Sequence, residues 1–405
     1  MAEIRPFTGW RYNEMMAGEI GRLLAPPWDV IDEEKRARLL NQSPYNIVHL
    51  IDRKADPARV AVVWQQWREQ KIVVPETAPC FYLLRHRFSH QGQNLERTGI
   101  LALLKLEDFS SGRVIPHEQI FDRYRDNRLK LIGCCRANFS PVFLLYKDGL
   151  WPEKLVEEAT ALTETVFEGD SLTLLRLNRE TVLARIQEFF EPEPLFIADG
   201  HHRYQAALAY ARNHPQPENQ YVMVYLVSLR SPGLLIAPTH RYIPGEISLE
   251  RPELKSYFQV ETVPDLSRMF SAMPADGTTC FGAWDGKKFF VLTLKEMNQI
   301  LPFLPEQRSL PWKTLDGVVL HYFLLPRLLG VSHEGSEKKF FYDRDPEAVM
   351  AKRRQQGQGL VFFLRPVKKE QFVAVASSGE VMPQKSTYFF PKVPSGLVIH
   401  YFGKQ

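Results

Sequence analysis

Apolar residues recur along the chain at two different spacings, and the spacing changes with position. In the first part the helical spacing predominates: Asp32 can cap a short helix over 32–43, and Trp64 and Trp67 share one face of a helix over 55–72. This pattern predicts an N-terminal segment of helices joined by loops.

Between residues 79 and 243, short apolar runs alternate with helical patterns. Two strands around a polar turn are expected at 79–108, and further strands at 140–148, 195–199, 220–229 and 233–243. Helices are expected at 179–192 and from Gly200 to about Asn213. This order predicts an α+β unit with helices over a mixed sheet.

The last third of the chain has its own pattern. Asp285-Gly286 predicts a tight turn in a hairpin over 280–294, and an apolar helical stretch over 313–330 is expected to break near Pro326. A surface helix is expected over 344–359, whereas the tail has no regular period. We therefore predict three parts: an N-terminal segment of residues 1–78 packed on the core, a core of residues 79–245, and a C-terminal α+β region of residues 246–405.

Composition narrows the classes of protein. The 405 residues include 51 basic and 47 acidic ones, so the charge is nearly balanced and no nucleic-acid partner is expected. There is no apolar run of about 18 residues, and the N-terminus is charged at once, so we expect neither a membrane span nor a signal peptide. Four cysteines without a C-x-x-C pair make no disulfide framework. The expected location is cytoplasmic.

The stretch "FIADGHHRYQAAL" at 196–208 joins an expected buried strand to an expected helix. Gly200 permits a sharp turn, which puts His201, His202 and Arg203 in the first helical turn. Backbone N–H groups and the positive end of the helix dipole point outward there and attract phosphate. Asp199, at the strand end, can bind Mg²⁺ or orient a hydroxyl.

A purely structural role of this box stays open. Asp199 can serve only as an N-cap, the histidines as polar surface, and Arg203 as one side of a surface ion pair. A zinc site is disfavoured, because neighbouring helical residues such as His201 and His202 diverge by about 100°.

A second box, "VIPHEQIFDR" at 114–123, places His117 and Glu118 on a turn stiffened by Pro116. A glutamate in this position can act as a general base, although a solvated loop is the alternative. Further candidates for holding a carboxylate or phosphate are basic and hydroxyl side chains in two later segments: Thr239, His240, Arg241, Lys385, Ser386 and Thr387. For "KSTYFFPK" the alternative is a packed C-terminal segment.

Together, "PHEQ" and "DGHHR" resemble the boxes of free L-serine kinases of the ParB/sulfiredoxin superfamily. That resemblance implies a nucleotide-binding core in which Glu118 is the base on the substrate hydroxyl. It also implies that the Asp199 carboxylate binds the metal or the substrate, and that residues 200–203 bind the phosphates. Sulfiredoxins carry a catalytic cysteine where this chain has His201, which excludes their chemistry.

The whole chain also resembles a bacterial family of unknown function numbered one thousand and fifteen. The segments that carry this likeness are "RPFTGWRY" (5–12), "APPWDVI" (25–31), "SPYNIVHL" (43–50), "RANFSPVFLLY" (136–146), "APTHRYI" (237–243) and "MPQKSTYFFPK" (382–392).

The sequence therefore predicts a ParB/sulfiredoxin-like core with an N-terminal extension and a second α+β region. Its expected activity is a kinase that uses ATP or ADP with Mg²⁺ and phosphorylates a hydroxyl of a small amino acid or similar acid, with free L-serine as first candidate. The expected partners are nucleotide and a small-molecule substrate, and a homodimer is left open. The alternatives are a nucleotide-binding or nucleotide-hydrolysing regulator related to ParB, and a binding protein without catalysis.

Overall fold

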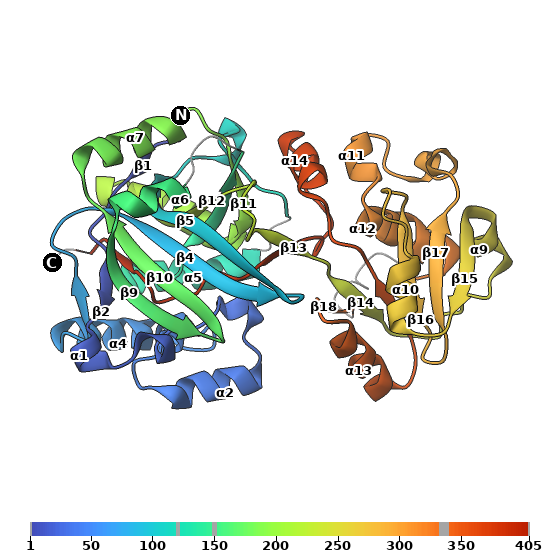
Figure 1. Cartoon of the computed structure of the whole chain (residues 1–405), viewed down its shortest axis with the longest axis horizontal. Coiled ribbons are helices and arrows are strands. Elements are labelled where there is room, and N and C mark those ends of the chain that lie inside the picture. Colours follow the sequence, from blue (N-terminus) through green and yellow to red (C-terminus); the bar gives the residue numbers. More distant parts are fainter. Residues whose placement is uncertain (1, 119–121, 148–151, 332–339, 404–405) are drawn as a thin grey trace. The chain divides into compact units, whose positions relative to one another are not determined.

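The computed structural model describes residues 2–118, 122–147, 152–331 and 340–403, and it divides into two compact units. Unit 1 comprises Met1–Pro116, Ile120–Leu235 and Pro391–Gln405, and unit 2 comprises His117–Gln119 and Ile236–Phe390. Figure 1 labels their elements. The chain therefore passes between the units four times, and the short segment at 117–119 belongs to unit 2 although its neighbours belong to unit 1.

In the described part of unit 1, nine strands form one mixed sheet in the order β6-β11-β8-β12-β5-β4-β10-β9, with β1 paired to β5. β11 runs parallel to β6 and antiparallel to β8, and β8 runs parallel to β12. The strands are β1 (Ile4–Arg5), β4 (Phe81–His90), β5 (Gln93–Lys105), β6 (Val114–Ile115), β8 (Val142–Tyr146), β9 (Thr160–Phe167), β10 (Asp170–Leu177), β11 (Leu195–Asp199) and β12 (Tyr221–Ser228).

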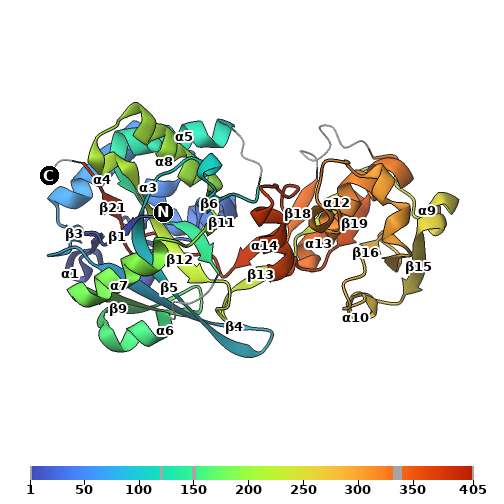
Figure 2. The same ribbon diagram turned by 90° about the horizontal axis from the view of Figure 1, so that it is seen from above.

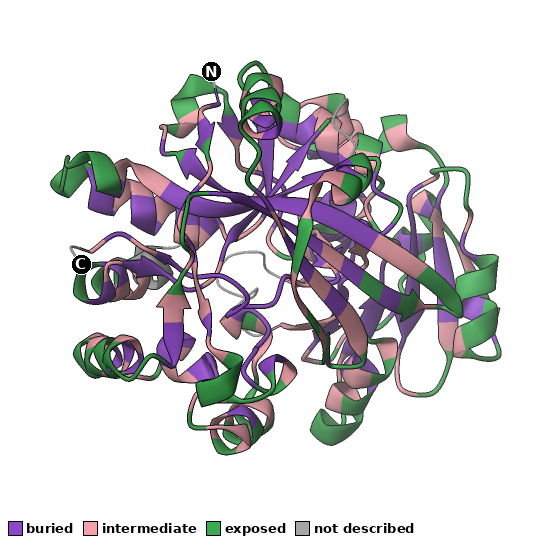
Figure 3. Ribbon diagram, turned by 60° about the vertical axis from the view of Figure 1, so that its left-hand side comes forward, coloured by how far each residue is buried: buried purple, intermediate pink, exposed green. Residues whose placement is uncertain are grey.

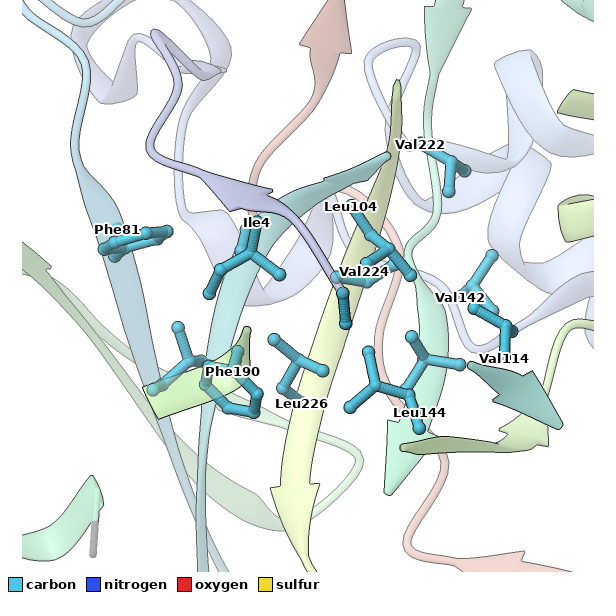
Figure 4. Close-up of a cluster of buried hydrophobic side chains, with 14 of the residues drawn as sticks. Ile4, Phe81, Leu104, Val114, Val142, Leu144, Phe190, Val222, Val224 and Leu226 are labelled. Atoms are coloured by element: carbon cyan, nitrogen blue, oxygen red, sulfur yellow. The ribbon is translucent and has the colours of Figure 1, made fainter. Parts of the chain in front are cut away.

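The central strands are buried because their sequences are nearly continuous apolar runs. Val142, Leu144, Val224 and Leu226 lie on neighbouring strands of one cluster, which Phe190 completes from a helix (Figure 4). Figure 3 shows the change from buried residues along the middle of the sheet to exposed residues at the tip of the β4–β5 hairpin.

Helices lie against this sheet. Two of them, α5 and α8, pack against each other (Figure 2), and α8 also contacts β8. The helices are α1 (Glu14–Ala17), α2 (Glu33–Gln42), α3 (Val48–Ile51), α4 (Pro57–Glu69), α5 (Asp122–Cys135), α6 (Pro152–Leu155), α7 (Glu180–Phe190) and α8 (His201–Asn213). Short 3₁₀ turns are η1 (Ile20–Arg22), η2 (Trp28–Val30), η3 (Phe109–Ser111), η4 (Val156–Glu158) and η5 (Pro217–Gln220). Two small strand pairs complete the unit: β2 (Trp10–Tyr12) with β3 (Val73–Pro75), and β7 (Ala137–Asn138) with β21 (His400–Tyr401).

Unit 2 is built on an antiparallel sheet with the order β15-β17-β16-β19-β14-β18. These strands are β14 (His240–Ile243), β15 (Phe258–Val263), β16 (Cys280–Trp284), β17 (Phe289–Leu294), β18 (Phe341–Asp343) and β19 (Leu360–Phe363), while β13 (Leu235–Ala237) pairs with β20 (Tyr388–Phe390). The helices are α9 (Pro252–Tyr257), α10 (Leu266–Ala272), α11 (Leu310–Lys313), α12 (Asp316–Val319), α13 (Pro346–Gln356) and α14 (Lys369–Ser377), with 3₁₀ turns η6 (Met297–Gln299) and η7 (Leu301–Phe303) and a π-helical segment η8 (Leu320–Leu328).

The α+β class expected from the sequence is confirmed, but the limits of the units differ from the predicted parts. The single strand expected at 233–243 is two strands, β13 and β14, and the pairing of β14 with β18 and β19 ties it to unit 2. The C-terminal residues return to unit 1, because β21 pairs with β7. The helical break expected near Pro326 is absent from η8, where the wider π-helical turn accommodates the proline.

Within the ranges described above, none of the helices combines the length and the apolar character that a membrane span requires.

Candidate functional site

The DGHHR box lies where β11 ends and α8 begins, in unit 1. Gly200 is the N-cap of α8 and has a left-handed backbone, with φ of 93°. A side chain there would be strained, and its Cβ would lie 2.9 Å from the Arg203 Nε. The N-cap position belongs to Gly200, which has no side chain, so Asp199 is not the N-cap residue. The first turn of α8, with His201 buried and His202 half-buried, keeps the backbone pattern that suits an anion.

The Asp199 carboxylate is held between two cations. The Lys392 ammonium donates to Oδ2 at 2.9 Å, and Nη2 of Arg203 lies 3.5 Å from Oδ1. Burial alone would raise the pKa of Asp199, but Lys392 and Arg203 together hold that pKa well below its usual value. Arg203 also donates to the Pro141 carbonyl, so its side chain is fixed rather than freely exposed.

A second guanidinium, that of Arg128 on α5, lies near Arg203. Burial and the charge of Arg203 lower the pKa of Arg128 to about 10. Within the described ranges Arg128 makes no hydrogen bond or ion pair. Its guanidinium carbon lies 5.7 Å from the centre of the Trp28 ring. Arg128, Arg203 and Ser140 line one small cavity of about 40 Å³. Two like charges at one cavity repel each other, and a bound anion would offset that repulsion.

Sequence reasoning did not single out Arg128, Ser140 or Lys392 as site residues. Lys392 ends the quoted "YFFPK" segment, but it reaches Asp199 across 193 positions, and no local pattern shows such a contact. Arg97 was also missed: it is fully buried in β5 and donates to the Pro391 carbonyl at 2.6 Å, which fixes the chain just before Lys392. Arg97 lies between Glu96 and Thr98, before the apolar run of β5, so no local pattern shows that it is buried.

His117 and Glu118 of the PHEQ box lie in unit 2 and contact the "KST" segment. The His117 Nε2 is 2.7 Å from the Thr387 hydroxyl, and its carbonyl accepts from the Met382 N–H at 2.8 Å. The Glu118 Oε1 accepts from the Lys385 N–H at 3.3 Å. Two segments that the sequence suggested separately are thus neighbours within one unit, while Gln119 lies outside the described residues.

Lys385 connects this box to a buried arginine. Its backbone is left-handed, with φ of 59°, which is uncommon for a residue other than glycine. Its carbonyl accepts from Arg241 Nη2 at 3.4 Å. Arg241 also donates to the Thr239 carbonyl at 2.7 Å and to the His321 Nε2 at 2.8 Å. The peptide units of Lys385 therefore contact Glu118 on one side and Arg241 on the other.

Only some of the remaining residues that the sequence suggested for binding a carboxylate or phosphate line a cavity. Thr239, Arg241 and Ser386 line one cavity of unit 2, whereas His240, Lys385 and Thr387 are not among its lining residues. The His240 ring packs on Phe363, and burial together with Arg241 lowers its pKa to about 4. His240 is therefore a neutral core residue at physiological pH.

The DGHHR box belongs to unit 1, whereas His117 and Glu118 of the PHEQ box belong to unit 2. The joint action of Asp199 and Glu118 in one reaction stays a prediction. Across the described ranges, no group of three or more His, Cys, Asp or Glu side chains is arranged to hold a metal ion.

No curated protein matches the chain in sequence. Among solved structures, a free serine kinase mutant in complex with ADP is 14% identical with a TM-score of 0.35, and the alignment covers 70% of this chain and 89% of that one. A conserved hypothetical protein from Pyrococcus furiosus is 16% identical (TM-score 0.34, 70% and 90% covered), and C-terminally truncated SbnI from Staphylococcus aureus is 12% identical (TM-score 0.34, 72% and 84% covered). All three TM-scores are below 0.5, so these likenesses support no conclusion about function. The model of the family described as "Protein of unknown function (DUF1015)" matches residues 4–318, most of the sequence, and the chain belongs to that family.

Proposed function

We propose that this protein is a nucleotide-dependent phosphotransferase that phosphorylates the hydroxyl of an amino acid or similar small acid, with free L-serine as the first candidate. The observation that carries the proposal is the convergence of Arg128 and Arg203 on one small cavity in unit 1, with Arg203 in the first turn of α8. This arrangement has the chemistry of a phosphate site.

The phosphate groups of ATP or ADP would bind at this first turn. Backbone N–H groups of residues 201–203 and the positive end of the helix dipole favour negative charge there. Arg203 and Arg128 would add charged donors, and the Ser140 hydroxyl would add a neutral one. Asp199 would keep Arg203 and Lys392 in place through its two ion pairs.

Mg²⁺ is the metal that such a reaction uses, and it would neutralise charge on the phosphates. Asp199 was predicted as its ligand. Its carboxylate is engaged by Lys392 and Arg203, which favours a role in holding these cations over direct coordination of the metal. The metal would then be held chiefly by the nucleotide phosphates, as Mg²⁺ often is.

Glu118 would accept the proton of the acceptor hydroxyl. The Lys385 N–H holds one of its carboxylate oxygens, and the adjacent His117 is fixed by Thr387. A glutamate so oriented can act as a general base, a contribution of roughly 10²–10⁴ in rate.

A nucleotide-binding regulator is the second candidate. It is favoured by one observation: the residues proposed for phosphate binding all lie in unit 1, whereas Glu118 lies in unit 2. Such a protein would bind or hydrolyse nucleotide without making a phosphorylated small molecule.

The test separates these two functions by their products. The purified full chain is incubated with ATP or ADP, Mg²⁺ and a pool of hydroxy-amino acids and hydroxy acids, and mass spectrometry follows the pool. A product heavier by one phosphoryl group supports the kinase. Nucleotide consumed without such a product supports the regulator. Absence of both changes contradicts the kinase, and failure of ATP and ADP to bind in calorimetry contradicts the regulator as well.

A further inference from the structure

Arg97 is a buried cation of unit 1 that does not line the proposed phosphate cavity. It lies on β5 and is 0% exposed. Its Nη1 donates to the Pro391 carbonyl at 2.6 Å, while its Nε and Nη2 have no hydrogen-bond partner within the described ranges. The guanidinium carbon lies 5.0 Å from the centre of the Phe143 ring and 5.5 Å from that of Tyr225. Its described contacts are therefore one carbonyl and two aromatic rings.

Such contacts offset only part of the cost of burying a guanidinium. Burial takes the charge out of water and lowers the pKa of Arg97. Neutral partners recover little of that desolvation free energy, so a methionine of similar length should stabilise the fold about as well. A contribution to stability therefore does not account for Arg97.

The contacts of Arg97 lead to the two members of one ion pair. Pro391 precedes Lys392, whose ammonium donates to Asp199 Oδ2 at 2.9 Å. Phe143 is the residue opposite Asp199 where β8 pairs with β11, so these two side chains lie on the same face of the sheet. The guanidinium thus contacts a neighbour of each partner, and it ties the chain at Lys392 to the strand pair that carries Asp199.

The C-terminal segment also reaches the proposed phosphate cavity at a second point. Ser395 Oγ lies 2.6 Å from the Oγ of Ser140, which lines that cavity. Backbone hydrogen bonds in both directions join Ser395 to Ala25. Lys392 therefore lies between two anchored points, of which Arg97 makes the first.

We propose that Arg97 is a positioning residue of the phosphate site and that it acts through Lys392. By holding the Pro391 carbonyl, Arg97 keeps the Lys392 ammonium on the Asp199 carboxylate. Without Arg97, Lys392 would leave Asp199. The carboxylate would then pair more closely with Arg203 and compete with a bound phosphate. The inference rests on the proposed function only in this last step, because the position of Lys392 can be measured without nucleotide.

A set of variants of the full chain separates positioning from packing. Arg97→Met removes the donor to Pro391, Arg97→Gln is too short to reach that carbonyl, and Arg97→Lys keeps a donor and the charge. Lys392→Met removes the group through which Arg97 acts. Arg87→Met, on the neighbouring strand β4, removes the same charge from an exposed arginine that pairs with Glu96, and it is the matched control.

Mass spectrometry without nucleotide would follow reductive methylation of the lysines. Lys392, whose side chain is 14% exposed, should react slowly in the wild type. Its rate should rise severalfold in Arg97→Met and Arg97→Gln and stay near the wild-type rate in Arg97→Lys and Arg87→Met. Lys105, which pairs with Glu3, is the internal reference and should react equally in all of these proteins.

Calorimetry with ADP tests the last step. Arg97→Met should weaken ADP binding about tenfold, the scale expected when a hydrogen bond to a charged group is lost. In a Lys392→Met background the same substitution should change ADP affinity little, because the two residues act in series. Melting temperatures of the Arg97 variants should stay close to that of the wild type.

An unchanged methylation rate of Lys392 in Arg97→Met and Arg97→Gln would overturn the inference, and so would an equal rise in Arg97→Lys or Arg87→Met. Additive effects of Arg97→Met and Lys392→Met on ADP affinity would also overturn it. Failure of both Arg97→Met and Arg97→Gln to fold would do the same, since Arg97 would then serve packing alone.

The two measurements separate this inference from the proposed function. Faster methylation of Lys392 in the variants, with no ADP bound by the wild type, removes the phosphate site but leaves Arg97 as the residue that positions Lys392. ADP bound by the wild type, with an unchanged methylation rate in the variants, removes the inference but leaves the proposed function.

Discussion

Replacing Arg128 with methionine should stabilise the ligand-free protein and weaken its binding of phosphate. The folded state lowers the pKa of Arg128 from 12.5 to about 10 through burial and the nearby Arg203. At neutral pH the guanidinium is charged in the folded and in the unfolded protein. The lowered pKa of Arg128 in the folded protein therefore corresponds to a loss of about 3 kcal/mol of folding free energy. Methionine keeps much of the side-chain stem but loses the contact with Trp28, which is worth roughly 0.5–1 kcal/mol. We expect a net gain of about 2 kcal/mol.

Bound anion reverses the sign of this effect. Pyrophosphate or ADP at the cavity of Arg128 and Arg203 turns the repulsion into attraction, and at about 100 times its Kd a ligand stabilises the wild type by about 2.7 kcal/mol. Scanning calorimetry with and without pyrophosphate should show a smaller ligand-induced rise of Tm in Arg128→Met. Arg53→Met, which also loses a cation over the Trp28 ring, is the matched control and should keep the full rise. An Arg128→Met protein that is destabilised without ligand, yet gains the full rise with pyrophosphate, would refute the reasoning.

Four further outcomes are expected. Arg203→Ala should weaken ADP binding by about 1.5–3 kcal/mol in calorimetry, and unchanged affinity in a folded variant would move the phosphate site elsewhere. Glu118→Gln should lose roughly 10²–10⁴ of the transfer rate at unchanged ADP affinity, and wild-type turnover would remove the base. A variant without cysteines should keep its activity, because burial raises the pKa of three of the four thiols, and a loss of turnover with intact structure would contradict this. Because the pKa of Asp199 is lowered in the folded protein, its ion pairs should stabilise the fold above about pH 4, and this contribution should be lost as the pH falls below 3.8. Below pH 3.8 the urea midpoint of Asp199→Asn should therefore fall less steeply with pH than that of the wild type.

Local patterns predicted much of unit 1. The LFIAD strand, the turn at Gly200 and the helix to Asn213 are present as expected, because an apolar run, a glycine and a helical period all act over short distances. The hairpin turn at Asp285-Gly286 is present for the same reason. Strand β9 had no comparable signal, since it is largely exposed and mixes polar with apolar residues without a clean alternation. Strand β10 was also missed, although Leu172 and Leu174 alternate with polar residues.

The sites depended on contacts that the sequence does not display. The ion pair of Asp199 and Lys392 exists because the C-terminal segment returns to unit 1 after passing through unit 2. The convergence of Arg128 on Arg203 depends on the packing of α5 against α8. The sequence identified Arg203 and Glu118 as chemically useful residues, but their neighbours follow from the tertiary fold.

Hydrogen–deuterium exchange with and without ADP tests the central claim most directly. ADP phosphates bound at the first turn of α8 would contact the backbone N–H groups of residues 201–203 and slow their exchange. Peptides that span 199–204 should exchange more slowly in ADP, and the same peptides of Arg203→Ala should respond less at equal ADP concentration. ADP that binds by calorimetry but protects only peptides outside this turn, or ADP that does not bind at all, would contradict the phosphate site.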